Sequence, residues 1–369
     1  MATLELNSVH KYYLSGQKIV HAVDDLNLKV ADGELLAVLG PSGCGKSSTM
    51  RMIAGLEAVT YGTISIDGKA VNNLTPAQRN VALAFESYAL YQHMTVEQNI
   101  GFCLSSRGIA DAERSSRVHE IAATLGIQNL LGTRPGSLSG GQQQLVSLSR
   151  AIVRKPNIVL LDEPISHLDT MTRIETSMRI RELHNRMGIT MIYVTHNQEE
   201  ALALADRIAI MEGGRLLQIG TREQIIEEPA NMFVATFVGE PPINLIPCEL
   251  RKNDGGVVAR SAKGGFSVLL SKRQADIASR KGSGEVIAGL RPRDLHLAPL
   301  SKDYQSLSGT LRYSEFLGEN TNFGVEFEEN SIVVATVTPT GRLEKGEKRK
   351  VFLDAERLLF FDPDSGLRL

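Results

Sequence analysis

The sequence contains no tryptophan, few cysteines and no long hydrophobic run. No apolar stretch reaches the about 18 residues that mark a membrane-spanning helix, so we expect no segment that crosses a bilayer. The start, MATLELNSVHK, has an early Glu and no apolar block, and it therefore predicts no secretory signal. Cys44, Cys103 and Cys248 are far apart and in no metal-ligand spacing, which suits a reducing compartment.

An excess of charge of either sign is also missing. The chain has 40 Lys and Arg against 42 Asp and Glu, a net charge of −2. This balance argues against a chain-wide electrostatic grip on nucleic acid or anionic lipid. At ~150 residues per domain, the 369 residues have room for two or three domains. We therefore expect a soluble intracellular protein of more than one domain.

Short, continuous apolar runs mark the first part of the chain, and each is typical of a strand that is buried on both faces. They occupy residues 35–39, 158–161, 191–194 and 207–211, and Gly213-Gly214 predicts a hairpin turn into 216–219. Between about 96 and 150, helical spacing replaces these runs, which indicates an inserted helical subdomain. The alternation predicts an α/β fold with a doubly wound, mostly parallel sheet.

The pattern changes near residue 236. Glu240-Pro241-Pro242 ends the helical pattern because consecutive prolines lack the backbone donors that a helix needs. Short alternating stretches follow at 256–260, 266–270, 310–313, 322–327, 332–337 and 350–353. The sequence therefore predicts a first domain at 1–235 and a second at 236–369, the second being a small sheet or barrel.

A glycine-rich segment directly follows the first apolar run and precedes a helical stretch. It consists of Gly40, Pro41, Ser42, Gly43, Cys44, Gly45, Lys46, Ser47 and Ser48. This is the P-loop pattern, in which glycines let the backbone wrap around phosphate oxygens and the helix N-terminus supplies positive potential. We expect Lys46 to reach the β- and γ-phosphates and the Ser47 hydroxyl to coordinate Mg²⁺.

Two adjacent carboxylates, Asp162 and Glu163, end the apolar run at 158–161. Side chains at the carboxyl ends of parallel strands meet at the same edge of a sheet. We therefore expect Asp162 to hold the magnesium shell through water, and Glu163 to orient and deprotonate the attacking water. Without the P-loop, an acidic cap between strand and loop would be the simpler interpretation.

The segment Leu138-Ser139-Gly140-Gly141-Gln142 resembles the signature of ATP-binding-cassette (ABC) ATPases, and it lies at the usual distance before Asp162. We refer to Ser139, Gly140, Gly141 and Gln142 as the signature. The resemblance implies an ATPase that uses ATP and Mg²⁺. It also implies a P-loop NTPase fold, in which a RecA-like core carries an antiparallel β subdomain and an inserted helical subdomain.

The same resemblance assigns three further residues. Tyr13 falls where an aromatic ring stacks on adenine, although the adjacent Tyr12 is an alternative. Asp169 resembles the residue that contacts the partner subunit, and His196 the switch histidine that reaches the γ-phosphate. In this family two cassettes pair head to tail, so we expect each ATP between one P-loop and the signature of a second copy.

One position departs from the family pattern. Glu86 stands where a glutamine is expected to bind Mg²⁺ and water. A carboxylate only accepts hydrogen bonds, and it adds negative charge near the γ-phosphate. We expect Glu86 to alter metal affinity and to slow hydrolysis without abolishing it, or else to be an adequate replacement; the magnesium dependence of the ATPase rate separates the two.

The segments 287–292 and 361–369 resemble the C-terminal, OB-fold-like (TOBE-type) regulatory domain of bacterial import ATPases of the maltose and glycerol-phosphate type. The resemblance implies the ATP-hydrolysing motor of an importer for a carbohydrate or polyol, at the cytoplasmic face of the cell membrane. Its partners would be a second copy, transmembrane permease subunits and, indirectly, an extracytoplasmic solute-binding protein.

Three alternatives remain at this point. The first is an importer for polyamines or metal ions, because a cassette does not touch its cargo. The second is a regulatory cassette protein with weak ATPase activity that sequesters a partner through its C-terminal domain. The third is a cassette ATPase acting on DNA or ribosomes, but we expect no nucleic-acid partner because the second domain lacks a basic stripe interleaved with aromatics.

Overall fold

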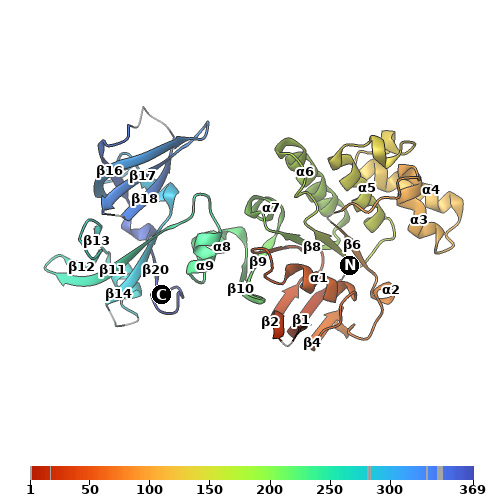
Figure 1. Cartoon of the computed structure of the whole chain (residues 1–369), viewed down its shortest axis with the longest axis horizontal. Coiled ribbons are helices and arrows are strands. Elements are labelled where there is room, and N and C mark those ends of the chain that lie inside the picture. The colour runs from red at the N-terminus through yellow and green to blue at the C-terminus, as the bar shows by residue number, and fades with distance from the viewer. Residues whose placement is uncertain are drawn as a thin grey trace. The chain divides into compact units, whose positions relative to one another are not determined.

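The computed structural model describes residues 2–16, 18–85, 87–280, 282, 284–329, 331–338 and 344–369. The chain divides into two compact units, Met1–Glu223 and Gln224–Leu369. Figure 1 shows the first unit from red to green and the second from green to blue. We describe each unit by itself.

A six-stranded sheet forms the centre of the first unit, in the order β10-β9-β3-β8-β7-β6. Its strands are β3 (Leu35–Leu39), β6 (Val81–Ala84), β7 (Ile158–Asp162), β8 (Thr190–Thr195), β9 (Arg207–Glu212) and β10 (Arg215–Gly220). All neighbours are parallel except the hairpin of β9 and β10. The predicted parallel sheet and hairpin are therefore confirmed.

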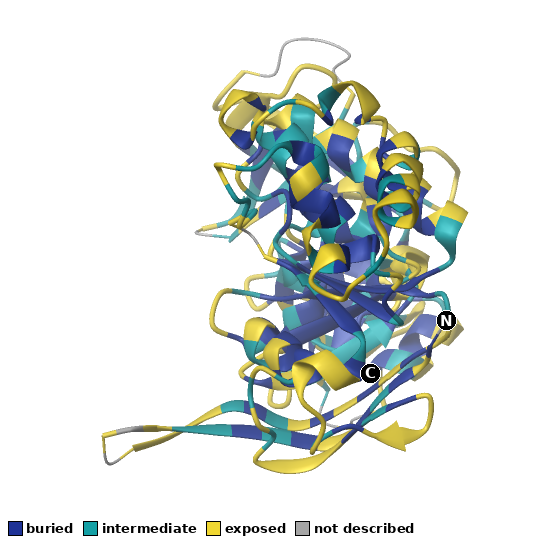
Figure 2. Cartoon of the chain, turned by 90° about the vertical axis from the view of Figure 1, so that its right-hand side faces the viewer, coloured by how far each residue is buried: buried dark blue, intermediate teal, exposed yellow. Residues whose placement is uncertain are grey.

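The central strands are continuous apolar runs because each contributes side chains to two hydrophobic cores, one on each face of the sheet. In β7, Val159 and Leu161 belong to one hydrophobic core, whereas Ile158 and Leu160 belong to the other. Successive side chains of a strand point to opposite faces, so a strand covered on both sides needs apolar residues at every position. Figure 2 shows these strands in dark blue, buried in the middle of the unit.

One face of the central sheet is covered by a second, antiparallel sheet with the order β2-β1-β4-β5. Its strands are β1 (Leu4–Ser15), β2 (Lys18–Val30), β4 (Tyr61–Ile66) and β5 (Lys69–Ala70). Helix α1 (Lys46–Ala54) contributes Met50, Met52 and Ile53 to the same core, and α2 (Pro76–Arg79) precedes β6. This is the antiparallel subdomain that the family resemblance implies.

Helices cover the other face. They are α3 (Val96–Ser105), α4 (Asp111–Thr124), α5 (Gly140–Ile152), α6 (Thr170–Met187) and α7 (Gln198–Leu204), with short 3₁₀ turns η1 (Gln128–Leu130) and η2 (Pro135–Ser137). Helices α3, α4 and α5 lie in the segment where the sequence predicts helices, and their apolar residues share a core with the central sheet.

The second unit contains two five-stranded antiparallel sheets, β13-β12-β11-β14-β20 and β15-β19-β16-β17-β18, which share one core. The strands are β11 (Asn244–Asn253), β12 (Gly256–Arg260), β13 (Ser267–Leu269), β14 (Glu285–Leu290), β15 (Leu295–His296), β16 (Gln305–Phe316), β17 (Thr321–Glu328), β18 (Ser331–Val337), β19 (Lys348–Leu353) and β20 (Leu359–Phe361). Helix α10 (Lys272–Ala278) and turns η3 (Pro292–Asp294) and η4 (Ala355–Arg357) connect them. The predicted all-β second domain is thus confirmed.

Helices α8 (Arg222–Glu227) and α9 (Met232–Phe237) explain why the division falls before the predicted boundary near 236. Ala235 of α9 shares a small core with Ile243 and Phe361 of the β unit. The buried Arg291 donates to the carbonyl oxygens of Ile226 and Val238, at 2.7 Å each. These contacts attach α9 to the second unit, whereas the prolines at 241–242 mark only where the helix pattern ends.

Candidate nucleotide site

The P-loop, residues 40–48, connects β3 to α1. Helix α1 begins at Lys46 directly after Gly45, whose φ of 104° is accessible to glycine but strained for other residues. A Cβ at Gly45 would lie 2.3 Å from the carbonyl oxygen of Ala22, so a larger residue would also force the loop away from β2. The strand, loop and helix that the motif requires are all present, and the first N–H groups of α1 can face an anion.

Lys46 folds back into this loop. Its Nζ donates to the carbonyl oxygens of Gly40 at 2.7 Å and Pro41 at 3.0 Å, and the residue is 5% exposed. A buried ammonium needs acceptors or an anion, so the position suits a phosphate-binding lysine. Ser47 is exposed, whereas Cys44 is buried and burial raises the pKa of its thiol.

The structure distinguishes the two neighbouring tyrosines. The Tyr13 hydroxyl lies 3.4 Å from Oγ of Ser48 in the P-loop. Tyr12 instead packs against His21, with ring centroids 4.1 Å apart. Adjacent residues of a strand point to opposite faces, which explains the difference. Of the two tyrosines, Tyr13 is therefore the one whose hydroxyl contacts the P-loop.

Lys11 supports Tyr13, and our sequence reasoning missed it. Its Nζ lies 4.8 Å from the centroid of the Tyr13 ring, a cation–π distance. The same ammonium donates to the carbonyl oxygen of Ala58 and pairs with Glu57, at 2.9 Å each. No sequence signal points to this contact, because Ala58 and Glu57 reach Lys11 through the pairing of β1 with β4.

Three neighbouring strands bring the other candidate residues to the P-loop edge of the sheet. The parallel register pairs Leu39 of β3 with Thr195 of β8, and Val194 of β8 with Asp162 of β7. The P-loop, the Asp162–Glu163 pair and His196 therefore leave the sheet at one edge. Ligand sites of open α/β sheets lie outside the carboxyl ends of the strands, so this edge is the candidate site.

Glu163 and His196 contact each other directly. Nδ1 of His196 lies 2.8 Å from Oε2 of Glu163, and an ionised carboxylate can only accept, so the imidazole donates. Glu163 has a φ of 46°, in the left-handed region, and its N–H donates to the carbonyl oxygen of Val194 at 2.9 Å. Such a conformation costs about 1–3 kcal/mol and persists where the surroundings hold it, which is typical of functional sites.

A magnesium ion fits this edge. The Ser47 hydroxyl and the half-buried Asp162 carboxylate are hard oxygen ligands, the kind that Mg²⁺ prefers. Within the described ranges, no group of three or more His, Cys, Asp and Glu side chains could hold a metal by itself. Magnesium usually keeps several waters and binds through one or two protein oxygens plus phosphate, so two ligands suffice.

The signature begins helix α5. Oγ of Ser139 accepts from the N–H of Gln142 at 3.3 Å, and Oε1 of Gln142 accepts from the N–H of Ser139 at 3.0 Å. This reciprocal capping box leaves the N–H groups of Gly140 and Gly141 without partners inside the helix. A Cβ at Gly141 would lie 2.5 Å from Cγ2 of Thr172 in α6, so within the chain the signature packs on α6.

Asp169 caps α6. Its carboxylate accepts from the Thr172 N–H at 3.1 Å and from the Thr172 hydroxyl at 2.6 Å, and these hydrogen bonds lower the pKa of Asp169. Asp169 remains exposed. The residue therefore has a local role that the sequence analysis did not include, while its carboxylate still faces solvent. Glu86 lies outside the described residues, so its role stays a prediction.

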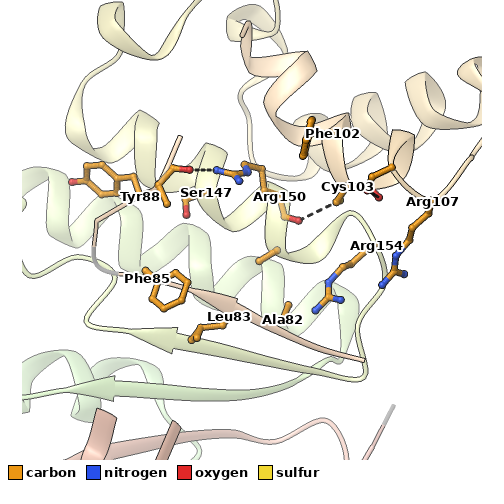
Figure 3. A pocket seen from close by; sticks show the side chains of 13 residues that line it. Ala82, Leu83, Phe85, Tyr88, Phe102, Cys103, Arg107, Ser147, Arg150 and Arg154 are labelled. Atoms are coloured by element: carbon orange, nitrogen blue, oxygen red, sulfur yellow. Dashed lines mark hydrogen bonds between the residues drawn. The ribbon is translucent and has the colours of Figure 1, made fainter. Parts of the chain in front are cut away.

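A groove of about 340 Å³ lies between β6, α3 and α5. Apolar side chains, including Phe85 and Phe102, line it together with Arg107, Arg150 and Arg154. Figure 3 shows Arg107 and Arg154 at one end of the groove and Phe85 and Tyr88 at the other. No carboxylate is among the described residues that line it, so the groove combines apolar surface with positive charge.

None of the helices in the described ranges combines the length and the hydrophobicity that a membrane span requires. The family model described as ABC transporter matches residues 23–166, and the model described as TOBE domain matches residues 288–361.

Three relatives illustrate the similarity. The chain is 40% identical to the sn-glycerol-3-phosphate import ATP-binding protein UgpC of Cupriavidus pinatubonensis, with 100% of both chains covered. It is 39% identical to the trehalose import ATP-binding protein SugC of Mycobacterium tuberculosis, covering 100% of this chain and 98% of the relative. A solved dimeric post-hydrolysis structure of the ATP-binding cassette MJ0796, bound to ADP and Pi, is 28% identical with a TM-score of 0.54, covering 59% of this chain and 98% of that one.

The two family models fall on the two units in the expected order. The match to import ATP-binding proteins extends over the whole length of the chain. The likeness to the MJ0796 cassette covers the share of the chain that a single cassette occupies. The chain belongs to the ABC transporter family, and over its full length it is a relative of the import ATP-binding proteins.

Proposed function

We propose that this chain is the ATP-hydrolysing motor of an importer for a carbohydrate or polyol, and that it works as a head-to-tail pair with a second copy. The observation that carries the proposal is the convergence of Lys46, Glu163 and His196 at one edge of the central sheet. The relatives named for the import of sn-glycerol-3-phosphate and trehalose support the solute class.

The residues at the sheet edge divide the chemistry among them. Lys46 and the N-terminus of α1 hold the phosphates, and Tyr13 offers a ring face to the adenine. Mg²⁺, when held by Ser47 and Asp162, supplies positive charge that stabilises the phosphate oxygens. Glu163 accepts the proton of the attacking water, and the hydrogen bond from His196 keeps its carboxylate in place.

A second copy completes the site. Within the chain, the signature packs on α6. The N–H groups of Gly140 and Gly141, which have no partners inside the helix, therefore bind a phosphate that another copy holds. An ATP held by a partner's P-loop supplies that phosphate. The exposed Asp169 caps α6, the helix on which the signature packs. The similar MJ0796 cassette was solved as a dimer bound to ADP and Pi, which supports this pairing. ATP then joins the two copies and its hydrolysis releases them.

The groove between β6, α3 and α5 is the proposed docking site for a cytoplasmic segment of a permease. An importer ATPase needs such a contact, and the groove offers Phe85 and Phe102, which are 42% and 41% exposed. Its arginines favour a segment that carries an acidic side chain beside apolar ones. Through this contact the chain would be held at the cytoplasmic face of the cell membrane, with a solute-binding protein acting on the outside.

Reversing one groove charge tests the docking. Arg107 is exposed at the end of the groove, so Arg107→Glu should leave the ATPase rate of the isolated chain unchanged. We expect it to weaken binding to the co-expressed permease by roughly 10-fold, because it places like charges at the contact. Co-purification and permease-stimulated ATPase activity measure the effect, with Lys69→Glu on the exposed strand β5 as the control. Equal loss of permease binding in Arg107→Glu and Lys69→Glu would contradict the assignment of the groove as the docking site.

Uptake tests the function itself. In a strain that lacks this chain, we expect loss of uptake of labelled sn-glycerol-3-phosphate or trehalose, restored by the wild-type chain and not by Glu163→Gln. Loss of putrescine or ferric-iron uptake instead would show that the solute class is wrong. Unchanged uptake of all four, together with an ATPase rate that permease does not alter, would favour the regulatory alternative.

A further inference from the structure

A buried carboxylate, that of Glu200, lies close to the sheet edge at which Glu163 and His196 meet. Glu200 in α7 is 5% exposed, and its Oε2 accepts two hydrogen bonds, from the Tyr193 hydroxyl at 2.8 Å and from the Thr195 hydroxyl at 2.9 Å. Burial, and next the Glu200 charge, raise the pKa of Tyr193 well above its usual value, so the tyrosine stays a donor. Both donors belong to β8, the strand that ends beside His196.

The hydroxyl of Thr195 reaches across His196. It donates to Glu200 and also accepts from the N–H of Asn197 at 2.9 Å. The residues on either side of His196 are therefore joined by one hydroxyl that Glu200 orients. Because the His196 side chain is 52% exposed, little packing holds its ring. The backbone on either side of His196, together with the hydrogen bond to Glu163, therefore determines the position of the imidazole.

The other carboxylate oxygen faces α6. Oε1 of Glu200 lies 3.9 Å from Nε of Arg173, and Nη2 of the same arginine donates to the carbonyl oxygen of Leu168 at 2.9 Å. Leu168 directly precedes Asp169. Figure 1 shows α6 and α7 beside β8, in line with these contacts. A chain of polar contacts therefore runs from the Asp169 segment to the His196 segment.

We propose that Glu200 is a positioning residue that couples the Asp169 segment to His196. The proposal rests on the proposed function, in which a partner copy contacts Asp169 and His196 supports Glu163. A displacement of Leu168 when the partner binds reaches His196 through Arg173, Glu200 and Thr195. A buried charge is costly unless it is paired, so the Glu200 carboxylate depends on its two hydrogen bonds and on the charge of Arg173, and a shift of any of these partners disturbs its position.

Isosteric substitution tests the coupling. Glu200→Gln keeps the shape of the side chain but removes the charge that faces Arg173. We expect kcat for ATP hydrolysis by the full chain to fall about 10- to 100-fold, as misplaced catalytic groups do, and the KM for ATP to stay within about twofold. Thr195→Val should reproduce this loss and Thr195→Ser should restore activity. The double variant should be no worse than the poorer single variant, because both act on one contact.

A matched carboxylate provides the control. Glu34 is 8% exposed and pairs with Nε and Nη2 of Arg207 at 2.7 and 3.0 Å, but it precedes β3 at the opposite edge of the sheet. Glu34→Gln should lower the unfolding temperature without changing kcat by more than about twofold. If Glu200→Gln lowers the unfolding temperature no more than Glu34→Gln but reduces kcat, the loss of activity comes from a displaced His196 and not from a destabilised fold.

The variant His196→Ala separates the two proposals. If His196→Ala leaves kcat unchanged, the role of His196 in the proposed function is wrong. If His196→Ala abolishes turnover but Glu200→Gln and Thr195→Val keep kcat within about twofold, the coupling alone is wrong. If Glu200→Gln does not fold, the Thr195→Val and Thr195→Ser pair decides, since equal activities would overturn the coupling.

Discussion

Glu163→Gln is expected to lower kcat for ATP hydrolysis by roughly 100- to 10,000-fold, the contribution of a positioned general base. An amide cannot take the proton of the attacking water, although it can still accept a hydrogen bond from Nδ1 of His196. ATP binding should persist, because Lys46 and the P-loop are untouched. Phosphate release under saturating ATP measures the rate, and size-exclusion chromatography with light scattering should show an ATP-bound pair that no longer separates.

The exposed Glu175 on α6 supplies a control for the general loss of one negative charge. We expect Glu175→Gln to hydrolyse ATP at the wild-type rate, and we expect its ATP-bound pair to dissociate after hydrolysis. A Glu163→Gln variant that retains the wild-type rate would remove Glu163 from the role of base. A variant that has lost both turnover and ATP binding would instead point to a damaged P-loop edge, since Glu163 follows β7 in the same sheet.

Lys46→Met is expected to weaken ATP binding by roughly 100-fold, because charged hydrogen bonds contribute about 1.5–3 kcal/mol each. The substitution also removes the bonds from Nζ to Gly40 and Pro41, which hold the loop in shape. Titration with a fluorescent ATP analogue measures the Kd. As a second readout, ATP should raise the unfolding temperature of the wild type and leave that of the variant unchanged.

Lys69→Met on β5 is the matched control, since Lys69 is an exposed lysine outside the site. Its Kd for ATP should equal that of the wild type. The unfolding temperature of Lys46→Met without nucleotide shows whether the fold survives. A folded Lys46→Met variant with a wild-type Kd would contradict the placement of Lys46 against the phosphates.

Much of the first unit could be predicted because its signals are local. The apolar runs of β3, β7 and β8 are continuous since both faces of these strands are buried. The P-loop lies between a strand and a helix, as the motif requires, and α5 begins at the signature. By contrast, β1 and β2 contain no continuous apolar run; in β2, buried Leu26, Leu28 and Val30 alternate with exposed residues. We expected this antiparallel subdomain only from the family resemblance.

Contacts between distant segments escaped prediction. Arg291 attaches α9 to the second unit through residues more than 50 positions away, so the division before residue 236 leaves no mark in the local sequence. Tyr12 and Tyr13 are equivalent in the sequence, and only the packing of β1 beside α1 separates them. In the sequence, nothing distinguishes Glu200 from other helical glutamates. Its ion pair depends on Arg173, which α6 places beside it.

By itself, the sequence predicted the chemical groups of this protein. Residue type and spacing predict the phosphate-binding loop and the acidic pair, and the family resemblance adds the signature and the histidine at position 196. The tertiary structure decided how these groups meet. Parallel register brings Lys46, Glu163 and His196 to one edge of the sheet, and α6 carries both the packing surface of the signature and Arg173. Such meetings depend on the register and packing of whole elements, which no short stretch of sequence specifies.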